Sequence, residues 1–287
     1  MPRRVRHTGA VPDRSLRARL TRHGALRVPQ ITVYFWVVKL LSTAMGEATS
    51  DFLVHTINPV LAVGLGFVGF VAALILQFAM RRYAAWTYWF AVVMVGVFGT
   101  MAADVLHVRF GVPYADSSVL YGAALVAVFV SWQRTERTLS FHTIDTPRRE
   151  AFYWAAVVAT FAMGTALGDL TAYTFHMGYF GSLLMFVGLI LIPAIGYRHF
   201  GWNPVFTFWS AYVLTRPIGA SFADWMGKPQ FVGGLGWGEG TVTVALTIAI
   251  IVVVSYLAIS RADVPQAHAS AQHGGAHRRR RLAAPSR

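Results

Sequence analysis

Hydrophobic residues occur in eight long runs that short polar segments separate. The runs fall at residues 31–52, 60–80, 86–106, 119–132, 152–173, 182–197, 205–225 and 241–259. A helix needs about 20 apolar residues to cross ~30 Å of hydrocarbon. The pattern therefore predicts an all-α, polytopic integral membrane protein with eight transmembrane helices.

The composition agrees with this prediction. Only 13% of the 287 residues are charged, 55% are hydrophobic, and the mean hydropathy is +0.50, whereas soluble domains have about 25% charged residues. A soluble enzyme is excluded on these grounds. The chain has no cysteine, which rules out disulfides, thiolate nucleophiles and iron–sulfur clusters.

Basic residues are concentrated at the two ends. They divide the chain into a basic arm at 1–28, a transmembrane domain at 29–260 and a basic tail at 261–287, and we expect the tail to be disordered. The net charge of +13 also suits nucleic-acid binding, but arms that flank an apolar body favour anionic lipid headgroups as partners instead. With both termini in the cytoplasm, 21 basic residues lie inside and two outside, as the positive-inside rule requires.

The transmembrane domain contains a fourfold internal repeat. The pattern W-x9-G-x4-D begins at Trp36, Trp89, Trp154 and Trp209, reaches Gly46, Gly99, Gly164 and Gly219, and ends at Asp51, Asp104, Asp169 and Asp224. The repeats fall near 29–80, 81–135, 147–198 and 202–260. Each unit has two helices and enters from the same side, so we expect four parallel copies. The glycines are expected to let neighbouring helices approach closely.

The first repeat, VPQITVYFWVVKLLSTAMGEATSDFLV, and its echoes WFAVVMVGVFGTMAAD, WAAVVATFAMGTALGD and WSAYVLTRPIGASFAD resemble a bacterial membrane-anchored family. That family is built from four tandem copies of a repeat of unknown function. The resemblance covers residues 28–260 and implies the fold and a bacterial inner membrane. It implies no activity, cofactor or oligomeric state.

Within each repeat, one helix face combines the tryptophan with the aspartate. Positions 0, 4, 7, 11 and 15 from the tryptophan lie within an arc of about 80°. We therefore expect the first helix of each repeat to line the interior and the second to face lipid. The aspartates then form either a ring around a polar cavity or caps near the outer interface. Glu47, one turn deeper than Asp51, favours the cavity.

Histidines accompany three of the aspartates. His55, His107 and His176 follow Asp51, Asp104 and Asp169, and a carboxylate with an imidazole one turn away can bind one divalent cation. The alternative is that these histidines are ordinary interfacial residues. We expect no resident cofactor, with a divalent metal ion as a candidate substrate.

Two basic residues lie inside the hydrophobic runs. Lys39 lies three residues after Trp36, and its amine could extend to the cytoplasmic surface. Arg216 lies too deep to do so, and we expect it to pair with Glu47 or Asp224, because a buried charge is tolerated when it is paired.

Three classes of function are compatible with these features. The acidic stripe and the parallel repeats favour a transporter or channel for a small cation. A membrane scaffold or sensor with lipid- or partner-binding basic arms is the main alternative. An intramembrane enzyme lacks a convincing nucleophile or a zinc motif, so we expect no enzymatic activity.

Overall fold

The computed structural model describes residues 26–264, so most of both predicted basic arms lies outside the described residues. This part of the chain is all-α. Its eight long helices are α2 (Val33–Thr56), α3 (Pro59–Ala79), α4 (Ala85–Phe110), α5 (Tyr114–Glu136), α6 (Pro147–Asp169), α7 (Gly178–Phe200), α8 (Pro204–Gly227) and α9 (Glu239–Ser260). Short turns join them, and a π-helical turn, η2 (Leu170–Thr174), continues α6.

Local sequence signals explain where several helices begin. α3 and α8 each start at a proline that follows an asparagine, and the asparagine side chain accepts hydrogen bonds from the first free backbone N–H groups. α6 starts at Pro147 after Thr146, which caps it in the same way. Proline suits this position because its missing N–H would have no partner within the helix.

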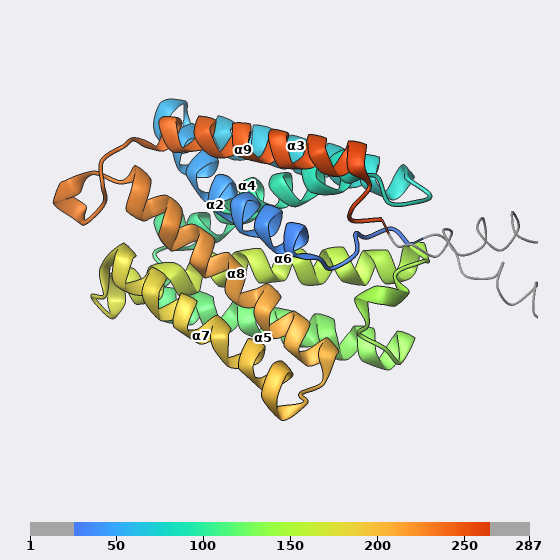
Figure 1. Ribbon diagram of the computed structural model, residues 1–287. Coiled ribbons are helices and arrows are strands. Elements are labelled where there is room, and N and C mark those ends of the chain that lie inside the picture. The colour runs from blue at the N-terminus through green and yellow to red at the C-terminus, as the bar shows by residue number, and fades with distance from the viewer. Residues whose placement is uncertain (1–25, 265–287) are drawn as a thin grey trace, which may run out of the picture.

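The first helices of the four repeats form an inner ring. α2 packs against α4, α4 against α6, α6 against α8, and α8 against α2. Figure 1 shows these four helices between α3 and α9 on one side and α5 and α7 on the other. The inner ring is therefore closed, and each of its helices contacts the helices of the preceding and following repeats.

Each outer helix packs mainly on the inner helix of the following repeat. α3 covers α4, α5 covers α6 and α7 covers α8, and α9 covers α2 and so joins the last repeat to the first. No described part of the fold is a free-standing two-helix unit. Each repeat buries its apolar surface only when its neighbour is present.

The repeat tryptophans lie at these interfaces. Each contacts the aromatic residue that precedes the tryptophan of the previous repeat: Trp89 with Phe35, Trp154 with Tyr88, Trp209 with Tyr153, and Trp36 with Phe208, at 5.7, 5.6, 6.0 and 5.8 Å between ring centroids. The fourth pair joins the last repeat to the first. The tryptophans therefore lie between inner helices.

The repeat glycines set the spacing of the same helices. A Cβ atom at Gly46 would lie 2.8 Å from the backbone of Gly96 in α4, and one at Gly219 would lie 2.1 Å from the Thr43 hydroxyl in α2. Gly99 and Gly164 meet the next helix at the corresponding position. The predicted close approach is confirmed at all four glycines.

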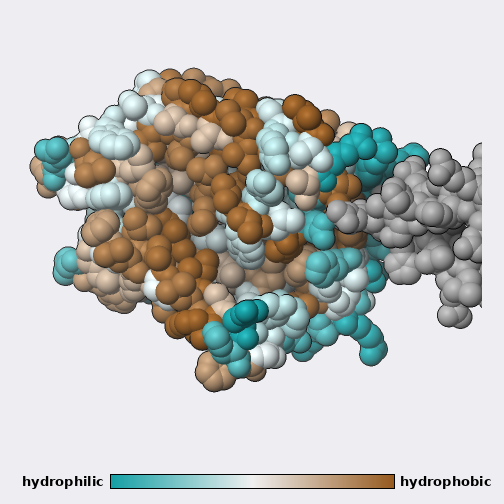
Figure 2. Space-filling model, in the orientation of Figure 1, coloured by the Kyte–Doolittle hydropathy of each residue, from teal (hydrophilic) through white to brown (hydrophobic). Residues whose placement is uncertain are grey.

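Six of the eight helices are long and apolar enough to cross a membrane. The other two, α2 and α8, contain Lys39, Glu47 and Arg216. Figure 2 shows hydrophobic residues over the middle of the face in view and hydrophilic residues gathered towards the end where the termini leave. These apolar helices are compatible with a multi-pass membrane protein.

The two described terminal segments meet at one end of the bundle, which we call the terminal end. The backbone N–H of Gln30 donates to Asp263, and the Tyr83 hydroxyl donates to the Asp263 carboxylate. Nearby, Arg27 forms an ion pair with the fully buried Glu150. Residues 26–30 and 261–264 are thus part of the packed structure.

Candidate functional site

The interior of the inner ring is built in layers. Counted from each tryptophan, positions −1, 3, 7 and 11 are buried in all four repeats. The sequence analysis predicted that the tryptophans and the residues at position 4 face the interior of the ring. That prediction is wrong. The residue at position −1 faces the interior in place of the tryptophan. The large indole lies between neighbouring helices instead, about 100° around the helix from position −1.

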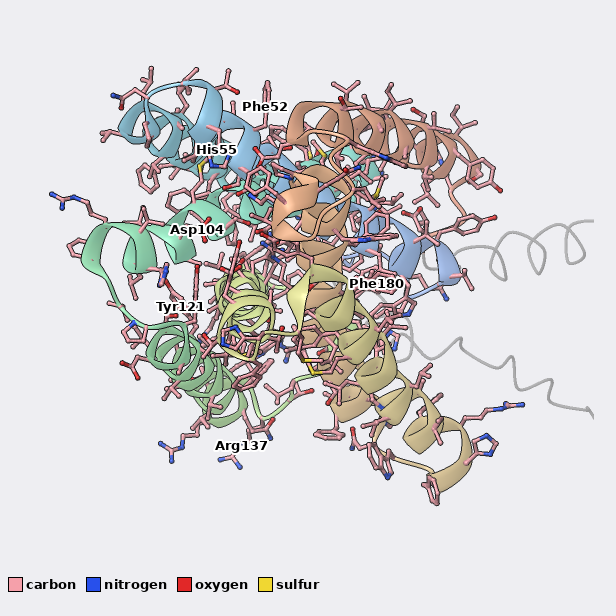
Figure 3. The ribbon with its side chains drawn as sticks, turned by 90° about the vertical axis from the view of Figure 1, so that its left-hand side faces the viewer. Phe52, His55, Asp104, Tyr121, Arg137 and Phe180 are labelled. Carbon is pink, nitrogen blue, oxygen red and sulfur yellow. The ribbon has the colours of Figure 1, made fainter. Side chains whose placement is uncertain are left out.

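The aspartates at position 15 line one cavity. It has a volume of about 480 Å³ and contains all four repeat aspartates, with Glu47 further in along the same face of α2. We call it the acidic cavity, and it reaches the helix ends at Pro59, Arg109 and Lys228. Figure 3 looks at this end of the molecule, where His55 and Asp104 are labelled on neighbouring helices.

Three carboxylates in the acidic cavity are close enough to share an ion. Glu47, Asp51 and Asp224 each offer an oxygen within 4.8 Å of the others. Carboxylate oxygens suit hard divalent cations such as magnesium, calcium and manganese. Asp104 and Asp169 line the same cavity but lie outside this group of three.

Arg216 forms the inner boundary of the cavity. One nitrogen of its fully buried guanidinium contacts Glu47 and donates to the hydroxyls of Thr100 and Thr165 at 2.5 and 2.7 Å. Glu47, Thr100 and Thr165 occupy position 11 of three repeats, so one arginine joins three inner helices. Glu47 is one of the two partners predicted for Arg216.

Lys228 lies at the outer part of the acidic cavity. Its ammonium group contacts Asp51 and donates to Glu239 at 2.9 Å. Burial opposes the charge of Lys228, but Asp51 and Asp224 outweigh it and raise the pKa of Lys228 above its ordinary value. Asp51 and Asp224 therefore stabilise the charged form of Lys228.

Asp104, Asp169 and Asp224 have no ion pair within residues 26–264. Glu47 and Asp51, in contrast, have basic partners. The acidic cavity thus holds more carboxylates than basic groups. Of the two predicted arrangements, a ring around a cavity and caps in the outer loops, the geometry is that of the first.

The three histidines predicted as metal ligands lie outside the carboxylate group. His55 is exposed and bonds to Glu239 at 2.8 Å. His107 bonds to the backbone oxygen of Val112 and stacks on Tyr114. His176 is exposed at a left-handed turn before α7. His55 lines the acidic cavity together with Asp51, and Glu239 is its bonding partner because the α8–α9 loop brings Glu239 to the end of α2.

The sequence analysis did not predict two features of the cavity. Glu239 begins α9 and joins the charge network of the first repeat. Tyr173 lines the cavity from η2, the π-helical turn directly after Asp169. A π-helical turn adds one residue per turn and often occurs at functional sites, but no local residue pattern announces it.

Lys39 does not reach a surface, so the expectation that its amine extends to the cytoplasm is wrong. Its side chain is fully buried, and Nζ lies 4.1 Å from the ring centre of Phe161 and 4.2 Å from that of Tyr212. Rings from α6 and α8 thus enclose the Lys39 amine inside the ring, and the aromatic residues at position −1 separate it from the terminal end.

The repeat pattern also identifies the chain's relatives at the level of a family. A comparison with curated proteins finds no match, and a comparison with solved structures finds none either. A family model described as a repeat of unknown function matches four segments, at residues 34–83, 87–138, 152–199 and 207–263. These segments agree with the four predicted repeats and cover most of the chain. The chain therefore belongs to the family described as Repeat of Unknown Function (DUF347).

Proposed function

We propose that this protein is a membrane transporter for a small cation and that the acidic cavity is its binding site. All eight long helices cross the bilayer, with both ends of the chain in the cytoplasm, and a divalent metal ion is the favoured substrate. The observation that carries the proposal is a set of three aspartates, Asp104, Asp169 and Asp224, which face one cavity and have no ion pair in the described part of the chain. Charged groups at membrane depth are costly to retain and usually mark an ion pathway.

The interior of the ring favours a transporter over an open channel. Between the acidic cavity and the terminal end, the buried layers contain Arg216, Phe161, Lys39 and Tyr212. Beyond them, Phe35, Tyr88, Tyr153 and Phe208 are also buried. A cation in the cavity would meet two buried basic side chains and then an aromatic barrier. Movement across the membrane therefore needs a second conformation, as in alternating access.

The proposal is tested by cation binding and flux. Titration calorimetry and vesicle uptake with Mn, Zn, Ni and Cu should show saturable binding that weakens as the pH falls, because protons compete for the carboxylates. Glu47→Gln, Asp51→Asn and Asp224→Asn should each weaken binding by about tenfold or more, since loss of even an outer-sphere partner costs ~10–100-fold. Asp224 should matter as much as Asp51, because it shares the group of three.

Asp116→Asn is the matched control. Asp116 is an exposed aspartate in the first turn of α5, and it does not line the cavity. Equal behaviour of this variant and the three cavity variants would refute the proposed site. Binding without uptake would favour the second candidate, a membrane sensor, for which the filled interior of the ring is the supporting observation.

A further inference from the structure

Lys39 is a buried amine that the acidic cavity does not use. Its side chain is fully buried in α2, and Nζ has no hydrogen-bond or ion-pair partner within residues 26–264. Its nearest aromatic neighbours, Phe161 and Tyr212, present their ring faces to it. Those faces attract a cation, but they supply no carboxylate to balance its charge.

A second cation makes protonation of Lys39 more difficult. The guanidinium of Arg216 lies 5.3 Å from the centre of the same Phe161 ring, and its carboxylate partner is Glu47. Glu47 therefore balances the charge of Arg216 and leaves Lys39 without a carboxylate partner. Because arginine stays protonated in proteins whereas a buried lysine readily loses its proton, Lys39 is the group that gives up its charge.

The distribution of lysine and arginine in this chain also indicates that Lys39 is the group that loses its charge. Of the 25 basic residues, 23 are arginines, and the only lysines are Lys39 and Lys228. Lys228 is held in the charged form by Asp51 and Glu239. Lys39 is thus the single basic side chain outside the histidines whose chemistry and surroundings both permit a neutral state.

Hydroxyl groups lie between Lys39 and the terminal end. The Tyr88 and Tyr153 hydroxyls are hydrogen-bonded to each other one layer beyond Lys39. The titratable and charged groups in the same layer as Lys39 or in adjacent layers are Tyr88, Tyr153, Tyr212, Arg216 and Glu47. Further along the surrounding helices lie Tyr34, Asp51 and His55 of α2, Asp104, His107 and Arg109 of α4, Arg148, Arg149, Glu150 and Asp169 of α6, Asp224 of α8, and Glu239 and Tyr256 of α9. Glu150 is already paired with Arg27.

We infer that Lys39 is a proton-binding site that couples cation movement to a proton. In the conformation described here the amine is neutral. When the aromatic layer at the terminal end opens, the lone pair of Lys39 accepts a proton from water there and forms the ammonium. When that layer closes again, the ammonium gives this proton to water in the acidic cavity, and the neutral amine is restored. One proton therefore crosses the membrane in each cycle. This inference rests on the proposed transport function, and it identifies the proton as the coupling ion.

The ionisation of Lys39 can be measured directly because the chain has only two lysines. Protein labelled with ¹⁵N at the lysine side chains gives two signals, and Lys228→Arg leaves only that of Lys39. Near neutral pH we expect Lys39 to show the shift of a neutral amine and Lys228 that of an ammonium. An ammonium signal for Lys39 at that pH would overturn the inference.

Coupling is measured in proteoliposomes with an imposed pH gradient. The wild type should accumulate the cation against its gradient, whereas Lys39→Met and Lys39→Arg should lose accumulation but keep downhill uptake. Asp116→Asn should behave like the wild type. Accumulation of the cation by Lys39→Arg would contradict the inference that Lys39 binds and releases the coupled proton, because arginine stays protonated. If the wild type neither binds nor moves a cation, the proposed function fails, and the lysine spectrum alone decides whether Lys39 is neutral.

Discussion

At the residue scale, the buried pair of Arg216 and Glu47 stabilises the interior of the ring. Both side chains are at least 95% buried, and the same guanidinium also bonds Thr100 and Thr165. Removing one partner of such a pair leaves an uncompensated charge, which typically costs ~3–5 kcal/mol. We therefore expect Arg216→Ala to lower the thermal unfolding temperature in detergent sharply. Adding Glu47→Gln should restore part of the loss, because the second substitution removes the orphaned charge. If Arg216→Ala does not fold, Arg216→Met alone is compared with Arg216→Met combined with Glu47→Gln. A double variant that is less stable than the single arginine variant would show that the orphaned Glu47 charge does not cause the loss of stability.

At the element scale, the repeat glycines determine how closely the inner helices pack. A methyl group at Gly46 would meet the backbone of Gly96 at 2.8 Å, and backbone cannot move aside as a flexible side chain can. We expect Gly46→Ala to lower stability by about 1–3 kcal/mol, the usual cost of overpacking. Gly64→Ala is the matched control, since Gly64 lies within α3 and nothing is within 4 Å of an added Cβ. Alanine is the better helix former by about 0.5–1 kcal/mol, so this control should be neutral or stabilising. Thermal unfolding of both variants in one detergent checks the prediction, which fails if both lose the same stability.

At the scale of the whole molecule, the ring is closed by the contact of α9 with α2. The described terminal segments also lie next to each other, because the backbone of Gln30 bonds to that of Asp263. A circular permutant that links residue 264 to residue 26 and opens in the loop at 137–146 should therefore fold, since it keeps every helix pair and the orientation of every repeat. A chain that ends at residue 238 should not, because loss of α9 exposes the face of α2 that it covers. Size-exclusion chromatography and thermal unfolding distinguish the two. Folding of the truncated chain with native stability would show that ring closure is dispensable.

The candidate site could be predicted in part. The spacing of Trp, Gly and Asp fixed the repeat, and it also placed four aspartates at one level, since equal spacing on equivalent helices gives equal depth. Their convergence on one cavity depended on how far each helix is rotated about its axis. One residue changes that rotation by about 100°, so choosing the tryptophan as an interior residue misplaced one layer. The partners of Lys228 and His55 could not be foreseen, because Glu239 lies 184 residues from His55 along the chain.

The sequence by itself determined the helices, the four repeats and the apolar character of six helices. These properties follow from local composition and periodicity, which depend on residues a few positions apart. Only the tertiary structure decided that α9 covers α2, that Arg216 pairs with Glu47, and that Lys39 is enclosed by Phe161 and Tyr212. Those outcomes depend on which helix faces are brought together when the ring closes. The four repeats share the same Trp, Gly and Asp positions at every interface, so the pairing of the remaining residues is set by the packing of the whole ring.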